Sequence, residues 1–207
     1  MSRFKFETDI TAIGVCKLLS MIAGYVYVPV ALNYLGVEKY GVWATIVMIL
    51  SWINNFDLGI GNGLRNKLTE SLALKDGESK KLISSAYAVA SVVMIVVATA
   101  FSVMAVLVDW QRIFRVSDIR ENLSGVIIIC VVFVSLNFVL SICKNVLFAL
   151  QNPVSVSVMD FLVQMFNLIG LVAVKNIFES NLFVMSSIYG ISMLSVSVIS
   201  SIILYIK

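Results

Sequence analysis

The sequence is poor in charge and contains no histidine. Only 13% of its 207 residues are Asp, Glu, Lys or Arg, whereas a soluble domain carries about 25%. Cys16, Cys130 and Cys143 are scattered without paired spacing. These absences argue against a disulfide framework and against a His/Cys metal site. We therefore expect three free thiols, no bound metal and no cofactor.

Hydrophobic residues make up 60% of the sequence, and its mean hydropathy is +0.99. Repeated apolar runs of about 18 residues or more match helices that cross the ~30 Å core of a bilayer. Barrel strands would instead alternate apolar and polar residues. We predict an all-α integral membrane protein with six transmembrane helices, at residues 10–32, 42–58, 82–108, 123–147, 154–174 and 182–206.

The lysines and arginines in the terminal segments, in the loops and at the ends of these spans are distributed unevenly. Nine lie in the terminal segments and the second and fourth connections: Arg3, Lys5, Arg65, Lys67, Lys75, Lys80, Lys81, Lys144 and Lys207. Five lie in the remaining loops: Lys39, Arg112, Arg115, Arg120 and Lys175. Because cytoplasmic loops carry the excess of positive charge, we expect both termini in the cytoplasm.

A glycine-rich stretch, "DLGIGNG" at residues 57–63, raises the possibility of a phosphate-binding loop. It follows the apolar run "VWATIVMILSWINNF" and lacks the βαβ pattern that such a loop requires. The glycines instead predict a backbone turn at the membrane interface. Leu64, Leu68 and Leu72 then recur every four residues, which predicts an amphipathic cytoplasmic surface helix within residues 62–81, ended by Gly77.

Two sequence blocks carry a more specific pattern. The first reads "PVALNYLGVEKYGVW" over residues 29–43, and the second reads "DLGIGNGLRN" over residues 57–66, followed by "KKLISSAY". They resemble the N-terminal region of the O-antigen flippases, transporters of the multidrug/oligosaccharidyl-lipid/polysaccharide exporter superfamily. The matching positions of the first block are Pro29, Leu35, Gly36, Tyr40, Gly41 and Trp43. The resemblance covers residues 29–87, about a quarter of the chain.

This resemblance implies a function and a location. Members of the family have about twelve or more helices in two similar bundles around a central cavity. They flip undecaprenyl-diphosphate-linked O-antigen or polysaccharide repeat units from the cytoplasmic to the periplasmic leaflet of the bacterial inner membrane, in lipopolysaccharide biosynthesis. With six spans, the chain would form one bundle, as a truncated product or a fragment. Its expected partners are the lipid-linked oligosaccharide, membrane lipids and a missing C-terminal bundle or partner chain, but not nucleic acid.

Polar residues inside the spans suggest where a substrate would bind. Ionisable side chains at membrane depth are costly and tend to face a protein interior or a cavity. Ser157, Asp160, Gln164 and Asn167 form a stripe on the fifth span, and Lys17 lies at a similar depth on the first. We expect Lys17 to face the cavity and to pair with Asp160. The candidate substrate-binding residues are Lys17, Asp57, Arg65, Lys144, Asp160, Gln164 and Asn167.

The same residues leave other interpretations open. Lys17 and Lys144 could extend to the membrane interface, and the polar stripe could serve interhelical hydrogen bonding. A cation-coupled multidrug antiporter would use Asp57 and Asp160. A membrane-embedded glycosyltransferase or polymerase is disfavoured, because the longest loop has only about twenty residues and no acid/base pair is evident, so we expect no enzyme. Small residues of the sixth span predict close packing without chemistry: Ser186, Gly190, Ser197 and Ser201.

Overall fold

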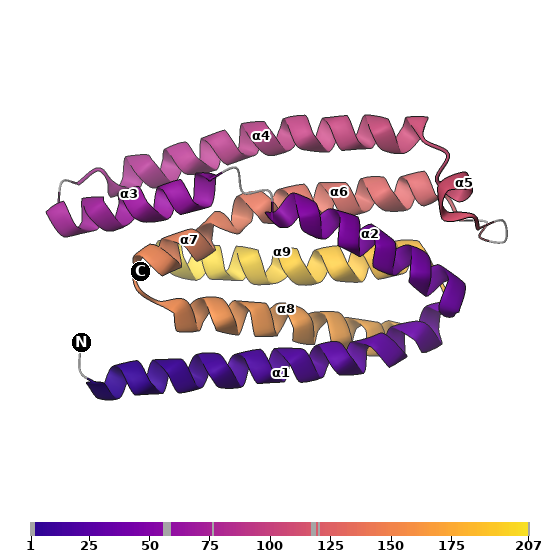
Figure 1. Ribbon diagram of the computed structural model, residues 1–207, viewed down its shortest axis with the longest axis horizontal. Coiled ribbons are helices and arrows are strands. Elements are labelled where there is room, and N and C mark those ends of the chain that lie inside the picture. Colours follow the sequence, from indigo (N-terminus) through magenta and orange to yellow (C-terminus); the bar gives the residue numbers. More distant parts are fainter. Residues whose placement is uncertain (1–2, 56–58, 76, 117–118, 120, 207) are drawn as a thin grey trace.

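The structure is a computed structural model that describes residues 3–55, 59–75, 77–116, 119 and 121–206. Every regular element in this part of the chain is a helix (Figure 1). In chain order these are α1 (Arg3–Leu35), α2 (Val37–Asn55), α3 (Ile60–Leu74), α4 (Ser79–Leu107), α5 (Trp110–Phe114), α6 (Leu123–Leu140), α7 (Ile142–Ala149), α8 (Pro153–Val174) and α9 (Leu182–Ile206). The prediction of an all-helical chain is confirmed for these residues.

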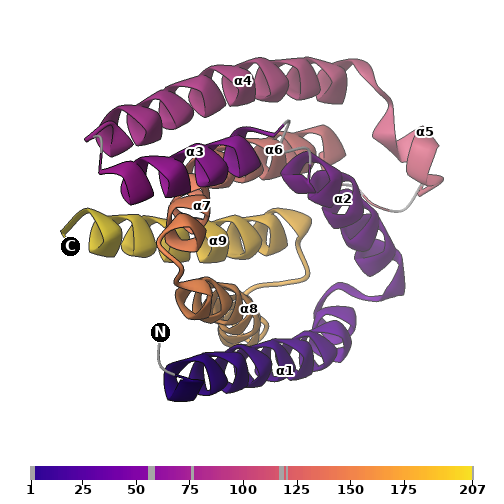
Figure 2. The same cartoon turned by 60° about the vertical axis from the view of Figure 1, so that its left-hand side comes forward.

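The long helices lie side by side and reverse direction at each connection (Figure 1). Helix α1 packs along α8, α8 along α9, α9 along α6, and α6 along α4. Turning the molecule keeps α1 at one edge and α4 at the other (Figure 2). Both termini lie at the end that holds α3 and α7, whereas α5 and the α1–α2 turn lie at the opposite end (Figure 1).

Five segments of the described chain are long and apolar enough to cross a membrane: Glu7–Leu35, Ser79–Leu107, Leu123–Ala149, Pro153–Val174 and Leu182–Ile206. They agree with five of the six predicted spans, as expected of an all-α, multi-pass membrane protein. The remaining prediction, at residues 42–58, coincides with α2. Helix α2 is not among the five apolar segments; it has Glu38 in its first turn, and the structure does not describe residues 56–58.

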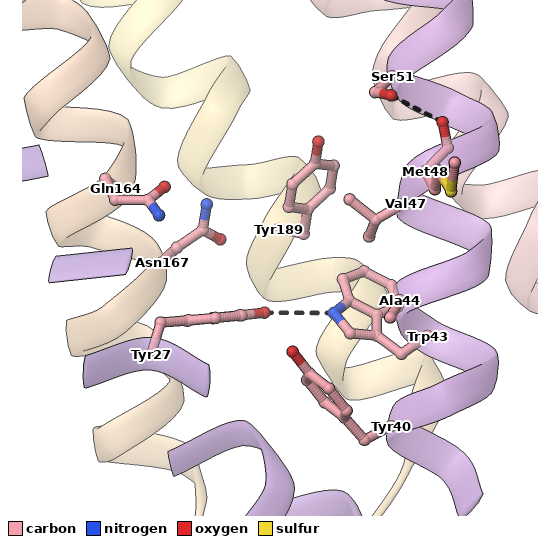
Figure 3. A pocket seen from close by; sticks show the side chains of 10 residues that line it. All are labelled: Tyr27, Tyr40, Trp43, Ala44, Val47, Met48, Ser51, Gln164, Asn167 and Tyr189. Atoms are coloured by element: carbon pink, nitrogen blue, oxygen red, sulfur yellow. Dashed lines mark hydrogen bonds between the residues drawn. The ribbon is translucent and has the colours of Figure 1, made fainter. Parts of the chain in front are cut away.

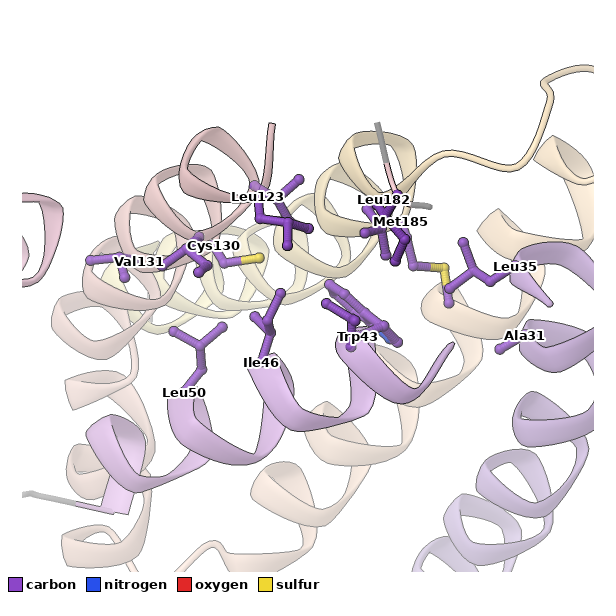
Figure 4. Close-up of a cluster of buried hydrophobic side chains, with 14 of the residues drawn as sticks. Ala31, Leu35, Trp43, Ile46, Leu50, Leu123, Cys130, Val131, Leu182 and Met185 are labelled. Atoms are coloured by element: carbon purple, nitrogen blue, oxygen red, sulfur yellow. The ribbon is translucent and has the colours of Figure 1, made fainter. Parts of the chain in front are cut away.

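Helix α2 is held by a buried apolar cluster (Figure 4). Trp43, Ile46 and Leu50 follow helical spacing, so they share one face of α2, and each is almost fully buried. That face meets Val131 of α6 and Met185 of α9 in the same cluster. This packing places the neighbouring face of α2 opposite α1 and α8, where the site described below lies.

Small residues allow α9 to pack closely, as the sequence predicts. Ser186, Gly190 and Ser197 are buried. A Cβ atom at Gly190 would collide with the ring of Phe133 on α6, so any larger residue would force that ring to move. The Ser197 hydroxyl donates a 2.8 Å hydrogen bond to Asn137 Oδ1 of α6. The two helices are therefore joined by both steric fit and a buried polar contact.

A helix follows the glycine stretch, as the four-residue leucine spacing predicts. Gly59 adopts φ 80°, a left-handed conformation that suits glycine, and α3 begins at the next residue. The helix ends at Leu74, before Gly77. Leu64 and Leu68 are buried in a cluster with residues of α4 and α7, whereas Leu72 is exposed. The location of this helix at the cytoplasmic membrane surface stays a prediction.

A charged contact joins the first turn of α2 to the α5–α6 and α8–α9 connections, at the end of the molecule opposite the termini. Lys39 Nζ lies 2.6 Å from Glu121 Oε1 and donates a 2.7 Å hydrogen bond to the Ser180 carbonyl. The other oxygen of Glu121 accepts a 2.7 Å hydrogen bond from the Leu182 backbone N–H, where α9 begins. One carboxylate thus fixes the start of α2 against the start of α9.

Candidate functional site

A pocket of about 450 Å³ lies between α1, α2, α8 and α9 (Figure 3). Its walls carry tyrosines, a tryptophan and two amides, although the helices around it are mainly apolar. The lining residues are Tyr27, Tyr40, Trp43, Ala44, Val47, Met48, Ser51, Gln164, Asn167 and Tyr189. A concave site with mostly apolar walls and a few placed polar groups is the usual form of a small-molecule site.

The aromatic side chains of the pocket hold one another in place. Trp43 Nε1 donates a 3.3 Å hydrogen bond to the Tyr27 hydroxyl, across the gap between α2 and α1 (Figure 3). The Trp43 and Tyr189 rings meet edge to face, with centroids 5.7 Å apart and planes at 81°. Edge-to-face pairs are a favourable aromatic geometry. The rings therefore form an ordered wall built from three helices.

Two amides form the opposite wall on α8. Gln164 and Asn167 are three residues apart, so they lie on one face of the helix. Gly24 of α1 lies close to this wall, since a Cβ atom there would be 3.2 Å from Gln164 Nε2. The absence of a side chain at Gly24 lets α1 approach α8 beside the pocket.

Asn167 is the most unusual residue of the pocket. It is only 4% exposed, and its Oδ1 atom has no hydrogen-bond partner among the described residues. A buried acceptor without a partner costs about 1–3 kcal/mol. Native proteins contain few such atoms, and each calls for an explanation. Because the oxygen itself is buried, a hydrogen-bond donor in the pocket would satisfy it once the side-chain amide turns toward the pocket.

The charged candidates from the sequence lie apart from the pocket lining. Asp160 Oδ1 is 2.6 Å from Lys144 Nζ of α7, so the expected Lys17–Asp160 pair is wrong. Helix α1 packs along α8, but α7 also contacts α8 and brings Lys144 to Asp160. Lys17 is exposed. The Arg65 guanidinium lies 5.2 Å from the centroid of the Phe148 ring. Asp57 falls outside the described residues.

The pocket thus unites two of the predicted site residues, Gln164 and Asn167, with aromatics that the prediction did not include. Tyr27 lies in the first predicted span, and Tyr40 and Trp43 belong to the first block of the family resemblance. Tyrosine and tryptophan within or beside apolar spans are therefore the signal that the sequence offers. Tyr189 gave no such signal, because only helix packing places it here.

The polar groups of the described lining are all uncharged. Tyrosine and tryptophan rings offer flat apolar surfaces, and the amides offer both donors and acceptors. Comparisons with models of protein families, with curated proteins and with solved structures find no match for this chain. Inference about its function therefore rests on the geometry of the site and on the resemblance described above.

Proposed function

We propose that this protein translocates undecaprenyl-diphosphate-linked saccharide repeat units from the cytoplasmic to the periplasmic leaflet of the bacterial inner membrane. The observation that carries this proposal is the uncharged aromatic and amide pocket between four helices of an otherwise apolar chain. A saccharide that crosses the membrane loses its hydration, and polar groups without partners are costly in a low-dielectric interior. Amides that replace water and rings that cover apolar sugar faces would lower that cost.

The distribution of charge supports a path for the carrier as well. Lys144, Asp160 and Arg65 lie on helices that meet at the end of the molecule where both termini are found (Figure 1). We propose that this end faces the cytoplasm, in line with its excess of lysine and arginine. Cationic side chains there would attract the diphosphate of the carrier, since ionic hydrogen bonds to phosphate are stronger than neutral ones.

We further propose that α2 is a sixth crossing and that the chain supplies one bundle of a two-bundle transporter. An even number of crossings explains why the two termini lie at the same end (Figure 1). Helix α1 exposes large apolar side chains such as Leu18, Met21 and Ile22. Lipid or a second bundle would cover this face, supplied by a C-terminal half or a partner chain.

Cation-coupled drug antiport is the second interpretation, and the pocket favours it less. A buried cation needs a paired charge, but the described lining contains no carboxylate. Asp160 pairs with Lys144 and is not among the residues that line the pocket. The glycosyltransferase or polymerase alternative gains no support from the pocket either, because its described residues offer no acid/base pair.

Deletion of the gene in its source bacterium tests the proposed function. Loss of a flippase should abolish the surface polysaccharide while undecaprenyl-diphosphate-linked repeat units accumulate in the cytoplasmic leaflet. Expression of the intact gene from a plasmid should restore the polysaccharide. Normal surface polysaccharide combined with hypersensitivity to organic cations would refute the proposal and favour the antiporter.

A further inference from the structure

The pocket of Figure 3 offers hydrogen-bonding groups without charge, and this property limits what it can bind. Neither lysine, arginine, aspartate nor glutamate occurs in its described lining. Asp160 precedes Asn167 by seven residues, which is about 10 Å along a helix at 1.5 Å per residue. The Lys144–Asp160 pair is therefore about two helical turns away from the amide. A diphosphate would find cations near that pair rather than in the pocket.

We infer that the pocket is a subsite for one uncharged, hydroxyl-bearing sugar ring of the cargo, with Asn167 Oδ1 as the acceptor for one of its hydroxyl groups. This inference rests on the proposed function and assigns a different part of the cargo to each place: the sugar to the pocket and the diphosphate to the charged end. Asn167 is a specificity-determining residue in this account, because its oxygen selects a ligand that carries a donor.

The unpartnered oxygen of Asn167 is the first support for this assignment. Asn167 lines the pocket (Figure 3), and its Oδ1 atom is buried and receives no hydrogen bond within the described chain, so a turn of the amide toward the pocket would present an unused acceptor. A sugar hydroxyl can donate to it, whereas a fully ionised phosphate has no proton to donate. Gln164, on the same face of α8, offers a second amide to a neighbouring hydroxyl.

The hydrogen bonds of Tyr27 supply the second support. Its hydroxyl accepts from Trp43 Nε1 at 3.3 Å and donates to Met185 Sδ at 4.0 Å. Because both functions of the hydroxyl are in use, Tyr27 offers the pocket the surface of a fixed ring. Such a surface suits the C–H face of a sugar, while the amides across the pocket suit its hydroxyl edge.

An organic cation fits the same walls less well. The tryptophan ring gives the strongest cation–π attraction, but Trp43 is only 2% exposed and its ring packs against Tyr189. The described lining also provides no carboxylate to neutralise a desolvated cation. An uncharged ring with several hydroxyl groups needs neither feature.

The experiment compares two ligands on the full-length protein in lipid nanodiscs. One ligand is a polyprenyl diphosphate bearing one N-acetylhexosamine, and the other is the same polyprenyl diphosphate without sugar. Asn167→Leu should weaken binding of the sugar-bearing ligand about tenfold, the effect of 1.4 kcal/mol, and leave binding of the sugarless ligand unchanged. Equal effects on both ligands, or no effect on either, would overturn the inference.

Ser135→Ala provides a matched control. Ser135 Oγ is the other buried side-chain atom without a partner in the described chain, and it lines an apolar pocket with residues of α4 and α6. Both substitutions remove an unsatisfied polar atom, so both should leave the unfolding temperature at or above that of the wild type. Only Asn167→Leu should change sugar binding. A clear drop in its unfolding temperature would mark Asn167 as a structural residue and contradict the inference.

A third measurement separates this inference from the proposed function. If the wild type binds neither polyprenyl ligand, the proposed function fails, and the pocket is then tested with free methyl hexosides. Saturation-transfer NMR that detects contact of a methyl hexoside with the wild type but not with Asn167→Leu would uphold the sugar subsite alone. No contact with the wild type would overturn it.

Discussion

Trp43 on α2 and Tyr27 on α1 are joined by a 3.3 Å hydrogen bond, which links the two helices on either side of the turn that connects them (Figure 3). Gly36 makes this turn possible with φ 77°, in the left-handed region that glycine adopts without strain. The first block of the family resemblance therefore has a structural meaning here. Its glycine reverses the chain, and its Tyr40 and Trp43 reach the pocket.

Trp43→Phe tests the importance of this hydrogen bond. Phenylalanine keeps an aromatic ring in the buried cluster but removes the N–H donor, so Tyr27 loses its partner. We expect a stability loss of about 1 kcal/mol in thermal unfolding, together with reduced polysaccharide export. Trp52→Phe on the same helix is the control, because the Trp52 side chain is 66% exposed. Equal behaviour of the two variants would show that the bond does not order the pocket.

Single-cysteine labelling tests whether α2 crosses the membrane. The background lacks Cys16, Cys130 and Cys143. The new cysteines replace Val37 at the start of α2 and Lys80 at the start of α4, both exposed. An impermeant maleimide added to intact cells should label the cysteine at position 37 and spare the one at position 80. Labelling of both positions from the periplasm would place α2 on one side of the membrane.

Gly190→Ala tests the close contact of α9 with α6. The added methyl group would collide with the Phe133 ring, and overpacking of this kind costs about 1–3 kcal/mol. Gly14→Ala on α1 is the matched control, because a Cβ atom there meets nothing within 4 Å. We expect a lower unfolding temperature for the first variant alone. Similar unfolding temperatures would mean that the helices separate easily at this point.

Substitutions at Lys39 and Glu121 test the charged contact at the end opposite the termini. Glu121→Ala removes both the ion pair and the acceptor for the Leu182 N–H, whereas Lys39→Ala removes the ion pair and the bond to the Ser180 carbonyl. Hydrogen bonds to charged groups contribute about 1.5–3 kcal/mol. A double-mutant cycle by thermal unfolding should therefore give a coupling of about 1 kcal/mol or more. A coupling near zero would show that the two side chains act independently.

The Lys144–Asp160 pair should contribute less to stability. Its lysine side chain is 29% exposed and its aspartate 58%, and solvent-exposed ion pairs contribute about 0–1 kcal/mol. We expect Asp160→Asn to change the unfolding free energy by less than about 1 kcal/mol. A much larger loss would indicate that the pair is shielded in the membrane.

Lys17→Ala tests the prediction that Lys17 faces the substrate path. If it does, the variant should export less polysaccharide than the wild type at the same protein level. Normal export would remove Lys17 from the substrate path.

The sequence predicts features that depend on one helix at a time. Polar residues three apart inside an apolar span predict that Gln164 and Asn167 share a face, and they do line the pocket. The small residues of the last span predict close packing, and Gly190 meets Phe133. Helix periodicity alone is sufficient for such predictions.

Features that depend on which helices are neighbours were not predictable in the same way. Similar depth suggested a Lys17–Asp160 pair, and α1 does pack along α8, but depth does not say which faces of the two helices meet. Lys17 is exposed, and Lys144 of α7 takes the contact with Asp160. Leucine spacing predicted an amphipathic helix but could not show that Leu64 and Leu68 pack against α4 and α7. Tyr189 enters the site only through the packing of α9.

The most direct test of the proposed function is polysaccharide export by an Asn167→Leu strain, with the substitution made in the organism's own copy of the gene. The comparison strain carries Ser135→Ala, and both variants must reach the wild-type protein level in the membrane. We predict that Asn167→Leu strongly lowers the amount of surface polysaccharide, while Ser135→Ala leaves it unchanged. Wild-type export by the Asn167→Leu strain would contradict the role of the pocket in transport.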